Sequence, residues 1–148
     1  MMNLSIRPFE ELKTGELYAA LKLRSDIFVV EQRCAYSDPD DFDQLATHVM
    51  GIYGDQIVAY ARILPPQTVY EQPSIGRVCV HRDFRNRGFG RKIFNSSLRE
   101  AQRIYPKKPI KIQAQIYLED FYRSCAFKTI SEPYLDFDIW HVDMLQEI

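Results

Sequence analysis

A basic turn that contains two glycines is the segment of the sequence best suited to chemistry. Residues 85–92 read Arg-Asn-Arg-Gly-Phe-Gly-Arg-Lys and follow a β-type run at residues 78–80. Glycines allow the backbone to approach a ligand closely, and the unpaired amides and dipole of a helix N-terminus favour negative charge. Cationic side chains add charge-assisted hydrogen bonds to such an anion. The pattern indicates a phosphate-binding turn that opens a helix, although two glycines alone fit a solvated basic turn equally well.

Other ligand-binding motifs are absent from the sequence. There is no Gly-x-x-x-x-Gly-Lys-Ser/Thr P-loop, and the third glycine and downstream acid of a dinucleotide fingerprint are missing. The three histidines and three cysteines show no zinc spacing, and the acidic run at residues 38–43 lacks the glycine and final glutamate of an EF-hand. We therefore expect no metal site. We expect residues 38–43 to form a solvated or helix-capping loop, with attraction of a cationic amine as the less favoured alternative.

The composition predicts one soluble domain that spans residues 1–148. Nearly half of the chain (46%) is apolar, which is enough for a core without metals or disulfides. The 19 basic and 20 acidic side chains nearly balance, which argues against a general attraction to nucleic acid or to anionic membranes. Cys34, Cys79 and Cys125 are odd in number and far apart, as free thiols of a reducing compartment would be. Since no apolar run approaches the ~20 residues that cross a bilayer, the expected location is the cytoplasm.

These candidate residues must be positioned by a chain of mixed α/β type. Alternating and β-rich runs predict strands at residues 4–7, 48–53, 56–64, 74–80, 110–115, 127–132 and 137–145. Gly54 and Asp55 predict a two-residue turn between the second and third of these strands. Helical spacing of apolar residues predicts helices at residues 14–30, from the glycine turn to about residue 104, and at residues 118–124. No internal repeat or composition break indicates a second domain.

The glycine turn also resembles a known family of enzymes. Arg85-x-x-Gly88-x-Gly90 after a strand is similar to the Arg/Gln-x-x-Gly-x-Gly/Ala motif of the GNAT superfamily of N-acetyltransferases. Further segments resemble the ElaA subfamily, namely Phe28-Val29-Val30-Glu31-Gln32, Ala59-Tyr60-Ala61-Arg62-Ile63-Leu64, Ile75-Gly76-Arg77-Val78 and Ala114-Gln115. The resemblance covers nearly the whole chain. It implies a single-domain α/β GNAT-like fold, with a mixed central β-sheet of about six or seven strands that is splayed at the acyl-CoA site and flanked by about four helices.

The resemblance implies where acetyl-CoA, the acyl donor, would bind. The amides from Asn86 to Gly90 would hold its pyrophosphate, with Arg85 and Arg87 beside them. Pantetheine would lie in the gap between the strand of Cys79 and the strand at residues 112–115, bonded to main-chain groups. The full set of expected acetyl-CoA contacts is Val78, Cys79, Val80, Arg85, Asn86, Arg87, Gly88, Phe89, Gly90, Arg91, Gln115 and Tyr122.

Tyr122 is the residue that the resemblance places as general acid. Acyl transfer to an amine needs a neutral nucleophile, donors for the oxyanion and a proton for the departing thiolate. Residues 115–127 resemble the family segment Asn-x-x-Ala-x-x-x-Tyr-x-x-x-Gly-Phe, in which the tyrosine is this acid. A phenol with a pKa near ~10 is protonated at neutral pH and can supply the proton. The sequence departs from the segment at Gln115, Leu118 and Ala126, which could shift the helix slightly.

The general base is harder to identify from the residues. Glu31, at the end of the first predicted helix, is one candidate. His141 is another, because its Ile-x-His segment resembles the C-terminal Ile-Pro-His of the subfamily. His48 and a relayed water are alternatives, although helix-end carboxylates are mostly solvated and a lone histidine is mostly a hydrogen-bonded structural residue. Cys79 is not expected to carry the acyl group, because a cysteine in a core strand usually serves as a small hydrophobe.

Together these residues predict an N-acyltransferase that passes an acetyl group from acetyl-CoA to a primary amine by direct attack in a ternary complex. The sequence does not identify the acceptor, which could be a small molecule or a peptide. An acyl-homoserine-lactone-type synthase is an alternative, because Arg24-x-x-x-Phe28, the acids at residues 40–43 and Arg62-Ile63-Leu64-Pro65 faintly resemble that family. A non-catalytic module that senses acyl-CoA is a third. Paired domains are common among such enzymes, so a homodimer is compatible with the chain, although no segment marks an interface.

Overall fold

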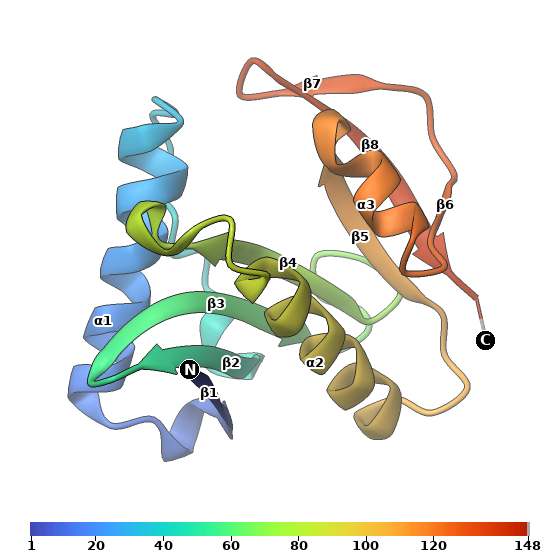
Figure 1. Ribbon diagram of the computed structural model, residues 1–148. Coiled ribbons are helices and arrows are strands. Elements are labelled where there is room, and N and C mark those ends of the chain that lie inside the picture. Colours follow the sequence, from blue (N-terminus) through green and yellow to red (C-terminus); the bar gives the residue numbers. More distant parts are fainter. Residues whose placement is uncertain (148) are drawn as a thin grey trace.

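The computed structural model describes residues 1–147 and shows one mixed β-sheet with helices on both faces (Figure 1). The strands are β1 (Met2–Pro8), β2 (Thr47–Tyr53), β3 (Gln56–Leu64), β4 (Ser74–Val80), β5 (Ile110–Gln115), β6 (Lys128–Thr129), β7 (Tyr134–Asp136) and β8 (Ile139–Gln146). The helices are α1 (Thr14–Arg24), its π-helical continuation η2 (Ser25–Glu31), α2 (Phe89–Ile104) and α3 (Glu119–Arg123). Short 3-10 segments are η1 (Phe9–Glu11), η3 (Asp43–Leu45), η4 (Arg82–Phe84) and η5 (Ile116–Leu118). No helix within residues 1–147 is both long and apolar enough to cross a membrane.

The strands form one sheet in the spatial order β1-β2-β3-β4-β5-β8-β6, and β7 also pairs with β8. Neighbouring strands are antiparallel except for β4 and β5, which are parallel because α2 carries the chain from one to the other. The predicted α/β fold is confirmed. Its counts differ slightly, since eight strands form where about six or seven were expected, and three α-helices are seen in the described chain where about four were expected.

Strands β4 and β5 separate almost at once. They pair only at Ser74 and Lys111, and beyond this point the two strands diverge, as Figure 1 shows. A β-bulge lies in the same part of β4, because Tyr60 pairs with Cys79 while Arg62 pairs with Gly76, which leaves two residues of β4 opposite one of β3. A bulge increases local twist and bends the strand. The expected splay of the sheet is therefore present, with the bulge at its edge.

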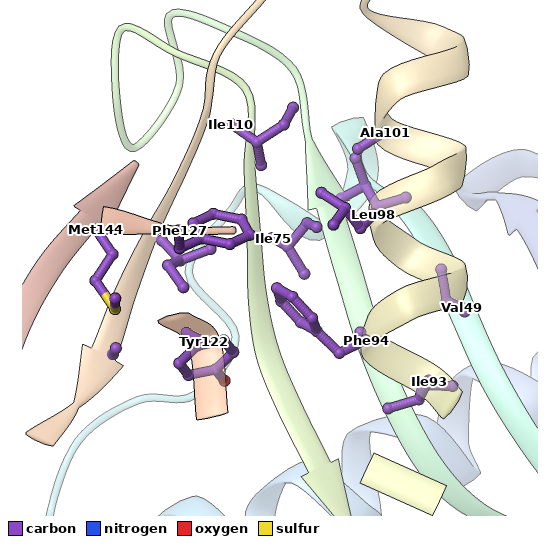
Figure 2. Close-up of a cluster of buried hydrophobic side chains, with 14 of the residues drawn as sticks. Val49, Ile75, Ile93, Phe94, Leu98, Ala101, Ile110, Tyr122, Phe127 and Met144 are labelled. Carbon is purple, nitrogen blue, oxygen red and sulfur yellow. The ribbon is translucent and has the colours of Figure 1, made fainter. Parts of the chain in front are cut away.

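The main core lies between the sheet and the two helices α2 and α3 (Figure 2). Phe94, Leu98 and Ala101 recur at helical spacing on one face of α2 and are buried. The ring of Phe94 lies 4.9 Å from that of Tyr122 and 5.7 Å from that of Phe127, measured between ring centroids. These aromatic contacts hold α3 against α2 across the point where the sheet divides.

Helix α1 covers the opposite face of the sheet. Ala20, Leu23 and Ile27 pack there in a second buried cluster that includes Tyr60 and Cys79. The helix predicted for residues 14–30 is present over its whole length, but its last seven residues are wound as the π-helix η2. A π-helix is wider than an α-helix, and π-helical turns are frequent at functional sites. Here it brings the end of the first helix to the mouth of the splay.

The C-terminal strands differ most from the prediction. The run at residues 127–132 contributes only the two-residue β6, and an unpredicted strand, β7, forms a hairpin with β8. The two turn residues, Phe137 and Asp138, have φ values of 47° and 62°. Left-handed positions usually hold Gly, Asn or Asp. Because a phenylalanine occupies one of them here, the sequence pattern does not predict this turn.

Candidate functional site

A cleft of about 790 Å³ opens where β4 and β5 separate. Its walls come from η2 and the loop after it, from β4, from the turn before α2, from β5 and α3, and from the β7–β8 hairpin. The lining includes nearly all the candidates, namely Glu31, Val78, Cys79, Val80, Arg85, Asn86, Gly88, Phe89, Gly90, Arg91, Gln115, Tyr122 and His141. Of the candidate side chains in the described chain, Arg87 and His48 lie outside this lining.

The glycine turn presents unpaired amides to the cleft. It is exposed from Arg85 to Gly88, and α2 begins at Phe89. Asn86 and Gly88 both have left-handed backbone, with φ values of 63° and 77°. Within residues 1–147, none of the amides from 86 to 91 donates a hydrogen bond to a protein acceptor. Six successive donors at a helix N-terminus are therefore free to bind an anion.

Arg85 is held in place by two neighbours. Its two terminal nitrogens donate to the carboxylate of Glu31 at 2.7 and 2.9 Å, and its Nε donates to the Val80 carbonyl at 3.0 Å. The hydrogen bonds from Arg85 are the main reason that the pKa of Glu31 is lowered. A carboxylate stabilised in this way is a weaker base, so the geometry disfavours Glu31 for proton abstraction and favours it as the group that orients Arg85.

Two further arginines flank the turn. Arg91 lines the cleft, with its guanidinium 4.8 Å from the centroid of the Phe121 ring and a hydrogen bond to the Ser124 hydroxyl at 3.3 Å. The guanidinium of Arg87 instead lies 5.0 Å from the centroid of the Phe84 ring and is not part of the cleft lining. Phe84 itself lines the cleft, so Arg87 lies next to the lining, and its place beside a bound pyrophosphate stays a prediction.

The edge of β4 is open to the cleft. Beyond Ser74 the strand pairs with β3 on one side only, so its outward peptide groups have no strand partner. Cys79 lies on this strand but its side chain faces α1, and burial raises the pKa of its thiol to about 12. A thiol with so high a pKa is a poor nucleophile at neutral pH. The backbone of β4, rather than the sulfur of Cys79, is what the cleft exposes.

Tyr122 combines a buried ring with a hydroxyl at the cleft. The residue is 7% exposed, and its ring packs in the aromatic cluster of the main core (Figure 2). In the described chain the Tyr122 hydroxyl has no hydrogen-bond partner. It is not fully buried either, since the Nε of Arg62 is the only side-chain nitrogen or oxygen of the described residues that is both fully buried and without a partner. Burial raises the pKa of Tyr122, so the phenol stays protonated across the neutral range.

His141 offers an unoccupied ring nitrogen to the same cleft. Its Nδ1 lies 2.7 Å from the Ile139 carbonyl, which can only accept a hydrogen bond. In the neutral ring Nδ1 therefore carries the proton, and the lone pair of Nε2 has no partner among residues 1–147. The ring stacks on Tyr134, and His141 pairs with Gln115 across β5 and β8. The position suits a proton acceptor.

His48 is a structural residue, which removes it from the alternatives for the base. The side chain is 1% exposed, and both ring nitrogens are bonded, to the Tyr60 hydroxyl at 2.7 Å and to the Asp43 carbonyl at 2.8 Å. Burial lowers its pKa. Neither nitrogen can reach a substrate.

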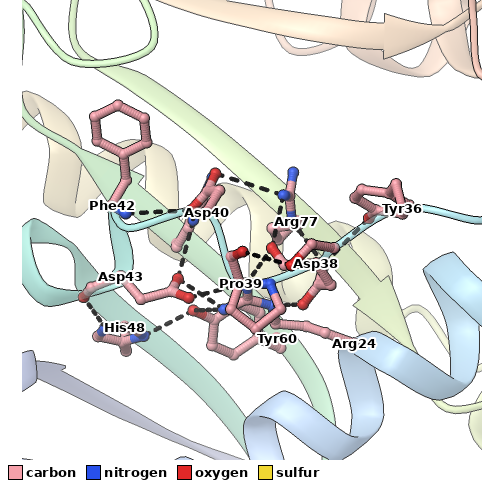
Figure 3. A network of polar contacts seen from close by, with 12 residues as sticks. Arg24, Tyr36, Asp38, Pro39, Asp40, Phe42, Asp43, His48, Tyr60 and Arg77 are labelled. Carbon is pink, nitrogen blue, oxygen red and sulfur yellow. Dashed lines mark hydrogen bonds and ion pairs between the residues drawn. The ribbon is translucent and has the colours of Figure 1, made fainter.

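The acidic run at residues 38–43 is not the solvated loop that we expected. Asp38 and Asp43 are buried and bind the fully buried guanidinium of Arg24, at 2.8 Å from each carboxylate (Figure 3). Asp40 binds Arg62, and these hydrogen bonds lower the pKa of Asp40 to about 2 against the opposing effect of burial. The carboxylates were misjudged because their partners lie on α1 and β3, far away in sequence.

This ion network also supports the bulge in β4. Arg77 lies in the bulge with φ 53°, a strained conformation for a residue other than glycine, and its Nε donates to Asp38 at 2.9 Å. In the network as a whole, the positive charges of three arginines balance the negative charges of three aspartates. These residues are Arg24, Arg62, Arg77, Asp38, Asp40 and Asp43. Among residues 1–147 no group of His, Cys, Asp and Glu side chains could hold a metal ion.

Several cleft residues were not recognised from the sequence. They are Tyr36, Tyr70, Gln113, Asp136 and Phe137. Four of them, all except Gln113, come from loops or from the unpredicted hairpin, and no motif marks them. The alternation of β5 is the one signal that could have drawn attention to Gln113, since it shares a strand face with Gln115.

Comparison with known proteins agrees with this geometry. A family model described as an acetyltransferase (GNAT) domain matches residues 30–148. Protein ElaA of Escherichia coli is 38% identical over 140 residues, which cover 93% of this chain and 92% of that protein. The crystal structure of Escherichia coli ElaA superposes with a TM-score of 0.94 at 36% identity, over 99% of this chain and 100% of that one.

Two more solved structures bear on the choice between an N-acyltransferase and an acyl-homoserine-lactone-type synthase. An acyl-CoA N-acyltransferase from Pseudomonas aeruginosa has a TM-score of 0.94 at 33% identity and covers 99% of both chains. A CoA-dependent acyl-homoserine lactone synthase, BjaI, has a TM-score of 0.80 over all of this chain and 83% of its own, but only 15% identity, which shows a shared fold alone. The family match and the ElaA relative lead to one conclusion: the chain belongs to the GNAT acetyltransferase family.

Proposed function

We propose that the protein is an N-acyltransferase, working as one domain, that transfers an acetyl group from acetyl-CoA to a primary amine by direct attack. The observation that carries the proposal is the row of unpaired amides from Asn86 to Arg91, at the mouth of the cleft between β4 and β5. A diphosphate is the anion that such a helix N-terminus suits best, because several amides can bind its oxygens at once.

In this proposal acetyl-CoA would lie along the length of the cleft. Amides 86–91 and Arg91 would hold the pyrophosphate, and Arg85, oriented by Glu31, would approach it from the other side. The free backbone edge of β4 would bond the pantetheine amides, as a strand does for an added strand. Gly88 leaves open space beside the phosphates, since no atom lies within 4 Å of the position that a Cβ would take.

His141 and Tyr122 would move the protons. The free Nε2 of His141 would accept a proton from the attacking amine, directly or through a water. Tyr122, kept protonated by its buried position, would donate its hydroxyl proton to the sulfur that leaves. A deprotonated amine and a protonated thiol are what acyl transfer requires on the two sides of the carbonyl, so the two residues account for both proton steps.

The first test is binding followed by turnover. Acetyl-CoA should bind the purified protein in a calorimetric titration with one site per chain, and free thiol should appear when a panel of primary amines is added. Absence of acetyl-CoA binding would rule out the proposed binding of a pyrophosphate by the amides of residues 86–91. Binding without thiol release from any amine would favour a sensing module, and release of a lactone from S-adenosylmethionine and an acyl carrier protein would favour the synthase.

A further inference from the structure

The cleft continues past the proposed thioester position into a chamber on the α1 side of the sheet. Residues Gln113 and Gln115 of β5 and His141 of β8 share the sheet face that lines it, because side chains alternate along each strand. Tyr36 from the loop after η2 and Phe137 from the β7–β8 turn meet there, with ring centroids 5.1 Å apart. The chamber is therefore walled by aromatic rings and polar side chains on the side where an acceptor would enter.

Asp136 is the one carboxylate of this chamber without a cationic partner. It accepts a hydrogen bond from the Gln113 amide at 3.0 Å, and no basic side chain of residues 1–147 lies within ion-pair distance of it. The other charged groups that line the cleft near it are neutralised, Asp40 by Arg62 and Arg77 by Asp38. The chamber thus carries one uncompensated negative charge.

Neighbouring charges outside the lining do not cancel that charge. Lys111, on the same face of β5, is paired with Asp143 at 3.5 Å and lies 4.4 Å from the centroid of the Tyr70 ring. Tyr70 itself lines the chamber. Because Lys111 already lies over the Tyr70 ring and Arg77 over the Tyr36 ring, the unpaired carboxylate of Asp136 is the group that favours an organic cation over a neutral group.

The register of the hairpin sets the distance between Asp136 and the proposed base. Asp136 pairs with Ile139, and His141 is the next residue on the same face of β8. Diagonal neighbours of this kind lie roughly 7–8 Å apart. An amine at His141 and a second cation at Asp136 would then lie close enough to belong to one short diamine.

We propose that Asp136 determines acceptor specificity by binding the second cationic group of a small diamine whose other amine is acetylated. The identity of the reaction in this proposal rests on the proposed function, whereas the existence of the cation site does not. Asp136 does not touch the reacting atoms, so it acts on the affinity and orientation of the acceptor and not on proton transfer.

Binding of two matched amines tests the site without turnover. Putrescine and n-butylamine, which differ by one amine, are titrated calorimetrically into the protein saturated with free CoA. The wild-type protein should bind putrescine roughly tenfold or more tightly than n-butylamine, as one charge-assisted contact implies. Asp136→Asn keeps the size of the side chain and an oxygen that can accept from Gln113, and it should remove this preference.

Asp138→Asn is the matched control. It makes the same change of charge two residues away, at an exposed turn position outside the cleft lining, and should leave the preference intact. Equal affinity of the wild-type protein for the two amines, failure of both to bind, or an equal effect of the two substitutions would each overturn the cation site. Failure of CoA itself to bind would instead contradict the proposed function.

Discussion

Tyr122 belongs to the hydrophobic core and to the cleft at the same time. Its ring is one of a cluster that includes Phe94, Phe121 and Phe127, which fixes the side chain without a hydrogen bond to the hydroxyl. The hydroxyl is therefore free to act on a ligand. Tyrosine is suited to this place because one end of the side chain is apolar and the other is polar.

Replacement of Tyr122 by Phe should separate the two roles. The ring packing is kept, so stability and the Kd for acetyl-CoA should change little, while kcat should fall by roughly a hundredfold or more because the proton donor is lost. Single-turnover kinetics and calorimetry measure the two quantities. Tyr105→Phe, in the same core cluster but away from the cleft, is the control and should have normal kcat. An unchanged rate for Tyr122→Phe would remove this residue from the acid role.

The two buried histidines show that residue type alone does not identify a base. His48 and His141 are both almost completely buried, at 1% and 8% exposed. The difference lies in their second ring nitrogens, since that of His48 is bonded to the Asp43 carbonyl and that of His141 is unpaired at the cleft. Only the set of neighbours separates a structural histidine from a candidate catalytic one.

At the level of elements, the start of α2 joins the sheet to the amides of residues 86–91, which are proposed to bind the phosphates. Gly90 packs near Val80, where its Cα hydrogen faces the strand, and Gly88 adopts left-handed backbone as the N-cap. This conformation turns the following amides outward. A residue with a Cβ at position 88 would favour a different φ and would aim those amides elsewhere.

Gly88→Ala should therefore weaken acetyl-CoA binding by roughly tenfold, about the value of one charge-assisted hydrogen bond, and destabilise the fold by about 1–2 kcal/mol. Calorimetry and urea unfolding measure the two effects. Gly15→Ala is the matched control: Gly15 lies in α1, its Cβ would meet no atom within 4 Å, and its φ is not positive. That change should leave binding intact and stabilise the helix. Normal acetyl-CoA binding by Gly88→Ala would contradict the proposed binding of the pyrophosphate by the amides of residues 86–91.

At the level of the whole molecule, the ion network links parts of the chain that are far apart in sequence. Arg24 on α1 binds the loop at Asp38 and Asp43, and that loop binds Arg62 on β3 and Arg77 in the β4 bulge. The network therefore holds α1, the loop and the bulged edge of the cleft in one arrangement (Figure 3). Burial makes each charge dependent on its partners, because no water is available to replace them.

Removal of Arg24 should be costly for this reason. Arg24→Met leaves two buried carboxylates without their main partner and should lower the free energy of unfolding by about 3–5 kcal/mol, measured by urea denaturation. Lys22→Met breaks an exposed ion pair with Asp26 on the same helix and should leave stability nearly unchanged. Similar effects of the two substitutions would mean that burial of the network contributes little to the fold.

Local features of the fold were predictable because short-range physics fixes them. The spacing of apolar residues is enough to locate α2, Gly54 and Asp55 are enough to locate the β2–β3 turn, and the glycine turn is recognisable from its composition. The β7–β8 turn was missed because its left-handed positions hold Phe137 and Asp138 in place of glycine. Resemblance to a family, and not periodicity, was the source of the expected splay.

By itself the sequence determined the family, the α/β class and the position of the glycine turn at a helix start. Tertiary structure decided which amides stay unpaired, that Glu31 is bound by Arg85, that His141 keeps a free nitrogen among the described residues, and that Asp38 and Asp43 are buried. The reason is physical. Hydrogen-bond partners, burial and charge compensation arise from residues that are distant in sequence and meet only when the chain is folded.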